Sequence, residues 1–485
     1  MTKRLRANEC TAETAVKKKD APRFDPLTPA HSPTTSNNIL SNASFHLRAH
    51  AKILSRLYSN TIETKLWATA EKGTSQAQPP KLYPEYTKPG GTEYVLRELD
   101  FWTSGFFPGS LYSLLQRKRM HGSLLNLATG ETLHELQLEF ACKWWTESLH
   151  QNALLSTTHD LGFMIGPWAK LAWQLNQDYK ALDTMIRGAK TLHGRFNRRV
   201  GLIRSWDTCV TKRYQFLNPK KEFLTVIDNM MNLDLLFYVA RLTHDQQMFR
   251  DATQHARTTM RTHIREDAST IHLVHFDPES GEVRERLTNQ GYTDTSCWTR
   301  GQAWAIAGFA ETYHWTLEME FLATAQKCAD YFLRRLPVTG VPPWDFDAAQ
   351  DHGYETQPTD TSAAMITAYG LLLIHKASVA MGKESGYLSA ALQLIESTCR
   401  RHVNGFTSPS QEEQLTSAGS GSVPGISVVA DGDTILNGAT INNHEFAPRQ
   451  WANHGLVYAD YYFMMVGNLL LDLGVGQQIL KAAAA

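Results

Sequence analysis

Cysteine is scarce in this chain of 485 residues, and its six cysteines stand singly at Cys10, Cys142, Cys209, Cys297, Cys328 and Cys399. No CxxC pair and no Cys/His pair at zinc-ligand spacing occurs, so no structural metal is expected. Long apolar runs are missing as well. Residues 1–21 are basic without an apolar stretch, Glu9 and Glu13 argue against a mitochondrial presequence, and no window reaches the roughly 20 apolar residues of a membrane span. We therefore expect a cytoplasmic protein with reduced thiols and no membrane partner.

An excess of one charge is also missing, since Lys+Arg and Asp+Glu both number 48. No strongly basic face is indicated, so nucleic acid is not an expected partner. The apolar content of 42% allows a sizeable core and excludes wholesale disorder. Twelve Trp and seventeen Tyr are many for this length. Most such side chains fill cores, but some line carbohydrate clefts.

Helical periodicity dominates the chain between a polar N-terminal tail, residues 1–42, and a short C-terminal tail, residues 477–485. The expected helices cover 43–61, 106–119, 132–149, 161–176, 178–196, 223–242, 245–263, 298–316, 318–335, 359–381, 384–402 and 455–473. A short strand is expected at 271–276, followed by a turn at 277–281. The stretch 404–449 is expected to be mostly irregular, with a loop tip at 417–422.

The helices follow one another in hairpins with short joints, which is typical of an open α-solenoid or of a closed α/α barrel. A solenoid would repeat a signature at a fixed period, and none is found. The unusual residues lie instead in the joints. This pattern favours an all-α fold in which residues 43–476 form one barrel, with a pocket built from loops and inner helix ends.

Asp228 is the first candidate for chemistry, because it lies at the expected entrance of the helix 223–242. A lone Asp at a helix start is usually a cap that accepts backbone N–H bonds. The neighbouring amides and thioethers favour more than a cap; they are Asn229, Met230, Met231 and Asn232. Asp160, beside His159, begins another helix and is open to the same two interpretations. If the two carboxylates share a pocket, they cannot both ionise easily, and one keeps a proton near neutral pH.

Further candidates surround the two carboxylates. Arg300 and Trp304 are four residues apart on one helix face, and a guanidinium beside an indole suits an acidic sugar. A surface cation–π pair is the alternative. Trp102 in an aromatic turn serves equally well as a wall for a sugar or as a lid on the barrel. His272 lies on the short strand, where a single His is more often structural.

Taken together, these clusters resemble the unsaturated glucuronyl hydrolases, glycoside hydrolase family 88. The resemblance covers residues 43–473 and rests on the order of six motifs: Trp102 to Gly109, His159 to Phe163, Asp228 to Asn232, Arg300 to Trp304, Pro343 to Asp347 and His454 to Phe463. It implies an (α/α)6 barrel and an enzyme that hydrates the C4=C5 double bond of an unsaturated uronic acid, left by a polysaccharide lyase at the non-reducing end of an oligosaccharide. It also implies that Asp228 is the general acid and base, Asp160 the second essential carboxylate, and His272, Gln290, Arg300 and Trp304 substrate contacts. Neither a metal nor an organic cofactor is implied.

Some members of this family bind a sulfate on the neighbouring sugar, but residues 442–451 do not align with those positions, so a preference for sulfated sugars stays open. A related reaction, that of the unsaturated rhamnogalacturonyl hydrolases, uses the same barrel and chemistry and is the second hypothesis. A non-catalytic helical scaffold is the third. The sequence does not indicate an oligomeric state.

Overall fold

The computed structural model describes residues 39–125, 133–348, 357–405 and 432–485, with side chains from residue 46 onward. The predicted N-terminal tail up to residue 38 and the predicted loop tip at 417–422 lie outside the described residues. The described chain, from residue 39 onward, belongs to one compact unit. It is mostly helical, as predicted, and its few strands are short and antiparallel.

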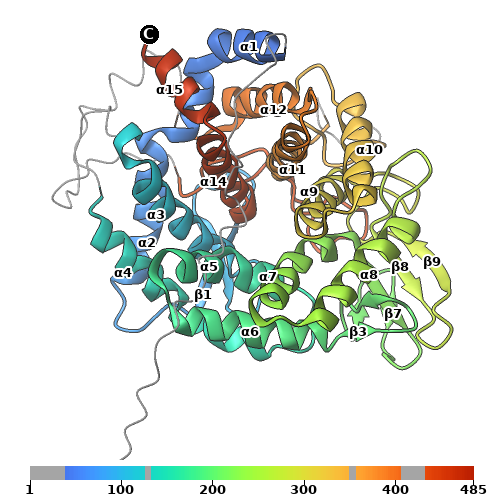
Figure 1. Cartoon of the computed structure of the whole chain (residues 1–485). Coiled ribbons are helices and arrows are strands. Elements are labelled where there is room, and N and C mark those ends of the chain that lie inside the picture. The colour runs from blue at the N-terminus through green and yellow to red at the C-terminus, as the bar shows by residue number, and fades with distance from the viewer. Residues whose placement is uncertain (1–38, 126–132, 349–356, 406–431) are drawn as a thin grey trace, which may run out of the picture. The chain divides into compact units, whose positions relative to one another are not determined.

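Within the described chain, six helices form a closed inner ring (Figure 1). They contact one another in sequence order, and the last returns to the first: α3 (Phe106–Leu125), α5 (Leu161–Asn176), α7 (Leu233–Thr243), α9 (Thr299–Thr316), α11 (Thr361–Ala380) and α14 (Val457–Asp472). The predicted closed barrel is therefore confirmed, and the open solenoid is not what the chain forms.

A second layer of helices covers the ring from outside. Its members are α1 (Ile39–Leu54), α2 (Asn60–Thr74), α4 (Glu135–Thr146), α6 (Tyr179–His193), α8 (Gln246–His263), α10 (Met319–Arg335), α12 (Tyr387–His402) and α15 (Val475–Ala484). α4, α6, α8, α10 and α12 each pack on the inner helix that precedes them in the chain, whereas α15 and the 3-10 helix η1 (Ser55–Tyr58) back α14. The predicted C-terminal tail is wrong for residues 477–484, because α15 is helical and its Ile479 is fully buried.

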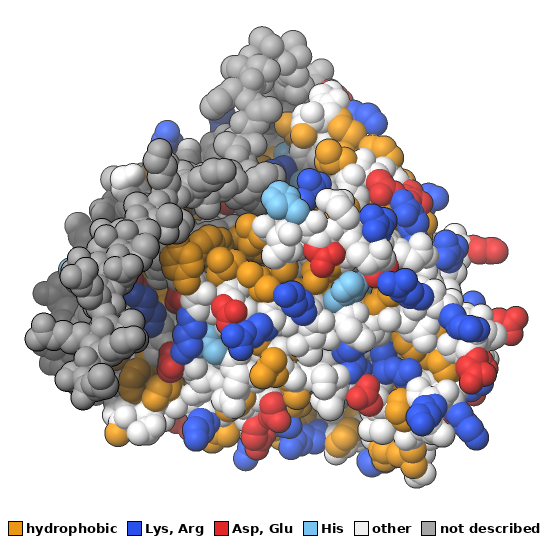
Figure 2. Space-filling model, turned by 60° about the horizontal axis from the view of Figure 1, so that its bottom comes forward, with side chains coloured by type: hydrophobic (Ala, Val, Ile, Leu, Met, Phe, Trp, Pro, Cys, Tyr) orange, Lys and Arg blue, Asp and Glu red, His pale blue; other side chains and the backbone are white. Residues whose placement is uncertain are grey.

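The amino-acid composition of a helix depends on whether it lies in the inner or the outer layer. In the outer helix α8, buried positions recur every three or four residues, which leaves a polar face for solvent. The inner helix α11 is buried on nearly all sides. It is long and apolar enough to cross a membrane by length and composition alone, but 72% of that stretch is buried in the structure. Its place between α9, α12 and α14 accounts for its composition. Figure 2 shows one outer face, on which Lys and Arg side chains are interspersed with Asp, Glu and apolar side chains.

The strands lie in the connections between helices. They are β1 (Leu82–Thr87), β2 (Tyr94–Glu98), β3 (Phe196–Asn197), β4 (Leu202–Ile203), β5 (Cys209–Val210), β6 (Gln215–Phe216), β7 (Phe223–Val226), β8 (Leu273–Phe276) and β9 (Val283–Leu287). β7, β8 and β9 form a three-stranded sheet in that order, and the other strands pair as hairpins. The predicted strand at 271–276 and its turn correspond to β8 and the loop to β9.

Candidate active site

Each inner helix begins at the same end of the ring, because each pair of neighbouring inner helices is joined through an outer segment that returns the chain. The residues of interest lie at these six beginnings: Trp102, Asp160, Asp228, Arg300, Asp360 and Tyr458. Helix N-termini carry partial positive charge, so this end of the ring favours an anionic ligand.

Asp228 lies in the first turn of a 3-10 helix, η3 (Ile227–Asn232), directly after strand β7. The prediction of a helix from residue 223 is therefore wrong for residues 223–226, and residues 227–232 form a 3-10 helix ahead of α7. The run Phe223–Val226 is apolar and carries two β-branched residues, so pairing with β8 overrides the helical pattern. Asp228 caps neither η3 nor α7, whose N-cap residues are Val226 and Asn232. Although the residue is partly exposed as a whole, its Oδ1 is buried and has no hydrogen-bond partner within the described chain.

The neighbours of Asp228 hold this turn in place. Asn229 Nδ2 donates to the Ile203 carbonyl oxygen at 2.9 Å, and Asn232 Oδ1 accepts from the Phe163 N–H at 3.3 Å. A Cβ at Gly162 would lie 2.5 Å from the Asn232 Cα, so only glycine permits this close approach of α5 to η3. The Asn229 and Asn232 side chains, which the sequence offered as candidates for chemistry, therefore fix the Asp228 turn in place, and Asn232 holds it against the start of α5 beside Asp160.

Asp160 occupies the N-cap position of α5 but makes no side-chain cap bond. Its Oδ2 accepts instead from the Thr158 hydroxyl at 2.6 Å, and its Oδ1 lies 3.4 Å from His159 Nε2. Neither carboxylate forms a cap bond to its helix, so the interpretation of Asp160 and Asp228 as helix caps is wrong. Asp160 turns instead to Thr158 and His159.

The electrostatic surroundings of Asp228 favour a retained proton. Burial raises the pKa of Asp228 to about 7; the Arg300 charge opposes this rise, and the Asp160 charge adds to it. A carboxyl group with such a pKa is substantially protonated near neutral pH. It meets the requirement for a general acid that works at that pH.

Arg300 is held by protein oxygens on all sides. Its Nη1 donates to Asp360 at 2.6 Å and to the Thr440 carbonyl at 2.7 Å, and its Nη2 donates to Gln290 at 2.9 Å and to the Ile441 carbonyl at 2.7 Å. Nη1 also lies 3.3 Å from the Ser362 hydroxyl, and together these contacts engage the Nη hydrogens, so a two-bond fork from both Nη atoms to a substrate carboxylate is not available. Only 2% of the side chain is exposed. Arg300 therefore acts on the pocket through its charge and by positioning the Gln290 side chain.

Aromatic rings form the floor of this end of the ring. The Arg300 guanidinium lies 4.6 Å above the Trp298 ring and 5.4 Å from the Tyr458 ring. The shared helix face predicts that it lies on Trp304 instead, and that prediction is wrong. The Trp304 ring lies 5.2 Å from Phe163, which in turn lies 5.5 Å from Trp102. Trp102 and Trp304 thus belong to one aromatic layer, in which Trp304 is buried and Trp102 only partly so.

His272 precedes β8 and accepts the Asn289 N–H on its Nδ1 at 2.9 Å. Burial lowers the pKa of His272 to about 3, so the ring is neutral and its Nε2 carries the hydrogen. That Nε2 has no partner in the described residues. The same holds, among other buried atoms at this end, for Asp228 Oδ1, Trp304 Nε1 and the Tyr458 hydroxyl. Buried polar groups are ordinarily paired, so these side chains have hydrogen-bonding capacity that the neighbouring protein atoms do not use.

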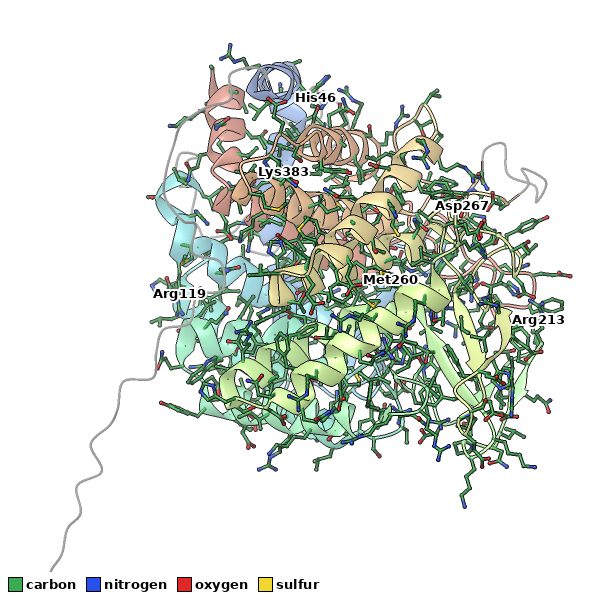
Figure 3. All side chains as sticks on the ribbon, turned by 45° about the vertical axis from the view of Figure 1, so that its right-hand side comes forward. His46, Arg119, Arg213, Met260, Asp267 and Lys383 are labelled. Atoms are coloured by element: carbon green, nitrogen blue, oxygen red, sulfur yellow. The ribbon has the colours of Figure 1, made fainter. Side chains whose placement is uncertain are left out.

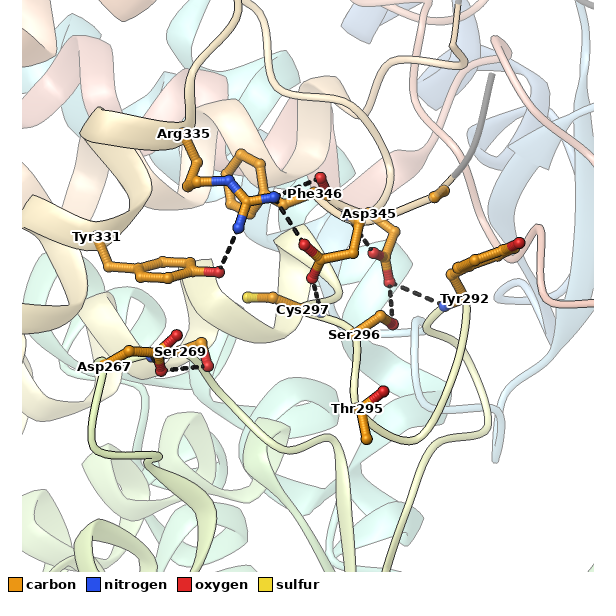
Figure 4. Close-up of polar contacts among 12 residues, drawn as sticks. Asp267, Ser269, Tyr292, Thr295, Ser296, Cys297, Tyr331, Arg335, Asp345 and Phe346 are labelled. Carbon is orange, nitrogen blue, oxygen red and sulfur yellow. Dashed lines mark hydrogen bonds and ion pairs between the residues drawn. The ribbon is translucent and has the colours of Figure 1, made fainter. Parts of the chain in front are cut away.

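The motif at residues 343–347 makes hydrogen bonds to the loop that precedes α9 (Figure 4). Asp345 Oδ2 accepts from the Tyr292 N–H and from the Ser296 hydroxyl, both at 2.8 Å, and Asp347 accepts from the Cys297 N–H at 2.8 Å. These bonds fix the loop between β9 and α9, which carries Gln290. Sequence reasoning did not single out Asp345, Asp360 or Tyr458 as individual residues. Asp360 had a signal in the sequence, because an Asp before an apolar helix is a typical cap, and here it both caps α11 and binds Arg300.

A closed ring of helix hairpins with two carboxylates and unpaired polar groups at its mouth defines a helical-barrel enzyme. No protein-family model matches the chain. It is 32% identical over 370 residues to the unsaturated glucuronyl hydrolase of Formosa agariphila, which covers 75% of this chain and 78% of that protein. It is 31% identical over 289 residues to the unsaturated chondroitin disaccharide hydrolase of Streptococcus agalactiae, or 59% of this chain and 67% of that one. The crystal structure of an unsaturated glucuronyl hydrolase specific for heparin superimposes with a TM-score of 0.66 at 27% identity, covering 91% of this chain and 97% of the other. The chain belongs to the unsaturated glucuronyl hydrolase family.

Proposed function

We propose that this enzyme removes the 4,5-unsaturated uronic acid from the non-reducing end of oligosaccharides that a polysaccharide lyase has produced. The reaction is a hydration of the C4=C5 vinyl ether and not a displacement at the anomeric carbon. The order of the motifs and the membership of the family support this proposal. The cytoplasmic location expected from the sequence stays a prediction.

Asp228 protonates C4 in this mechanism. Protonation of a carbon is difficult, so the acid must be neutral at rest and fixed in position. The raised pKa of Asp228 and the contacts of Asn229 and Asn232 support both requirements. Proton transfer leaves positive charge at C5 and the ring oxygen, which the nearby Asp160 carboxylate stabilises.

Water then adds at C5, and the Asp228 carboxylate takes one of its protons, so the acid is regenerated. The hemiketal that results opens the sugar ring and releases the shortened saccharide. His272 Nε2 and Trp304 Nε1 are buried N–H donors without partners in the described chain, suited to oxygens of the uronic acid. The fixed charge of Arg300, the Gln290 amide that it positions, His159 and Trp102 complete the proposed contacts.

The observation that carries the proposal is the Asp228 carboxyl group, buried and unpaired at Oδ1, with a pKa of about 7. The test is the ultraviolet absorbance of the conjugated double bond. Mixed with an unsaturated chondroitin disaccharide, the protein is expected to abolish this absorbance. An unchanged signal over a broad pH range with chondroitin, hyaluronan and heparin lyase digests would overturn the proposal.

The related hydrolysis of unsaturated rhamnogalacturonan is the second candidate, because its chemistry requires the same carboxylates. Two relatives carry chondroitin or heparin in their names, which favours glycosaminoglycan fragments for this chain. Turnover of an unsaturated rhamnogalacturonan disaccharide, with no turnover of the chondroitin or hyaluronan disaccharide, would reverse that choice.

A further inference from the structure

The segment that joins α6 to β7 is strongly basic. Residues 194–222 hold two acidic side chains, Asp207 and Glu222, and eight basic ones: Arg195, Arg198, Arg199, Arg204, Lys212, Arg213, Lys220 and Lys221. The whole chain has equal numbers of acidic and basic residues, so its overall charge conceals this local excess. In Figure 3, Arg213 from this segment lies at the edge of the molecule, beside the short strands.

The basic segment passes directly beside the candidate active site. The Ser205 carbonyl oxygen accepts the His159 N–H at 2.9 Å, and Trp206 pairs with Thr158 in an isolated antiparallel bridge. The Trp206 ring lies 5.6 Å from the His159 ring. Because neighbouring residues of an extended chain are about 3.3 Å apart, Arg204 lies within a few ångströms of this rim.

Three side chains of the segment form a basic strip, defined as Arg204, Lys220 and Lys221. Arg204 donates to the carbonyl oxygens of Pro219, at 2.8 Å, and of Glu222, and its guanidinium lies 4.6 Å from the Phe223 ring, so it contacts the backbone on either side of the two lysines. Within the described chain none of the three has a carboxylate within 4.0 Å, whereas Arg195 and Arg213 are paired with acids. Both lysines are exposed.

The acids nearest to the strip are engaged elsewhere. Glu222 Oε2 accepts the Asn218 N–H at 3.0 Å, and Asp277 is paired with Arg284. Arg284, whose charge is paired with Asp277, donates to the Lys221 carbonyl oxygen at 2.7 Å and so lies at the border of the strip. The two lysines therefore have no ion-pair partner within 4.0 Å among the described residues.

We infer that the basic strip binds the carboxylate or sulfate groups of the saccharide units that follow the unsaturated uronic acid. A sugar chain that leaves the pocket past Trp206 meets Arg204 first and the two lysines next. The strip then favours longer anionic oligosaccharides over the disaccharide, through charge rather than through the chemical step. This inference rests on the proposed function, which supplies the site from which the sugar chain extends.

The test compares an unsaturated chondroitin sulfate disaccharide with the corresponding octasaccharide. The variant Lys220→Glu/Lys221→Glu is expected to lower kcat/KM for the octasaccharide about tenfold at low ionic strength, mainly through KM, since exposed charge contacts are individually modest. The disaccharide rate is expected to stay within about twofold. In about 0.5 M salt the difference between variant and unchanged protein should largely disappear.

The matched control is Lys327→Glu/Lys383→Glu, which makes the same change in net charge at exposed positions on α10 and beyond the far end of α11. Lys383 is labelled in Figure 3, well apart from Arg213. Equal losses on both substrates, or an equal loss in the control, would overturn the strip as a saccharide surface. So would a double-stranded DNA fragment that binds the strip more tightly than the octasaccharide. Absence of turnover of both substrates by the unchanged protein would instead overturn the proposed function.

Discussion

Replacement of Asp228 by Asn should abolish turnover and at the same time stabilise the fold at neutral and higher pH. Burial raises the pKa of Asp228 from 3.8 to about 7, so the folded state holds this proton more tightly than the unfolded state does. Stability is therefore fully present at low pH and is lost as the pH rises through this range. From pH 4 to pH 8 the loss amounts to about 3–4 kcal/mol for a shift of this size. An amide does not ionise and avoids that loss.

Chemical denaturation of the unchanged protein and of Asp228→Asn at both pH values measures this effect. The variant should gain about 3–4 kcal/mol relative to the unchanged protein between pH 4 and pH 8, while kcat falls about 10²–10⁴-fold. Asp183→Asn, on the exposed face of α6, is the control and should change neither quantity. If Asp228→Asn destabilises the fold equally at both pH values, the carboxyl group has a structural role. A two- or threefold loss of kcat would remove it from the mechanism.

Three further predictions concern the surroundings of Asp228. Asp160→Asn should lower kcat about 10²–10⁴-fold with an unchanged circular dichroism spectrum; a loss below tenfold would contradict its role as the second carboxylate. Gly162→Ala places a Cβ 2.5 Å from the Asn232 Cα, so it should separate α5 from η3, destabilise the fold by about 1–3 kcal/mol and reduce kcat; unchanged unfolding and kinetics would show that the contact is not needed. Arg300→Lys should leave buried acceptors of Gln290 and the Ile441 carbonyl unpaired, which costs about 1–3 kcal/mol for each group, and should raise KM; a variant of normal stability and KM would refute the anchoring role.

The helical part of the fold could be predicted from the sequence, because the outer helices have clear periodic patterns and the inner helices are long apolar stretches. The bounds of α5 agree with the prediction at both ends, and those of α8, α9 and α10 differ by one residue at their starts. The start of the chain was harder. The single helix expected at 43–61 is in fact α1, η1 and part of α2, since the apolar pattern continues across the Ser59 cap that begins α2.

The region before α7 shows why the site itself could not be fully predicted. Residues 223–226 continue the apolar spacing of the following helix, and only pairing with β8, which lies 47 residues further along the chain, makes them a strand. The partners of Arg300 come from three separate loops and are invisible to local patterns. The sequence did indicate that acidic, basic and aromatic side chains lie at the starts of these helices. The roles of Asp228, Asp160 and the predicted substrate contacts stay predictions until the variants are measured.

Closure of the inner ring has a consequence for synthesis of the protein. The ring is completed only when α14 packs between α11 and α3, although α3 leaves the ribosome hundreds of residues earlier. Until then, the nascent chain exposes the apolar flank of α3 that α14 later covers. Contacts of such long sequence separation form slowly and leave partly folded chains prone to aggregation. A truncation before α14 should therefore yield an insoluble polypeptide rather than a smaller barrel, which solubility of the truncated chain on expression would contradict.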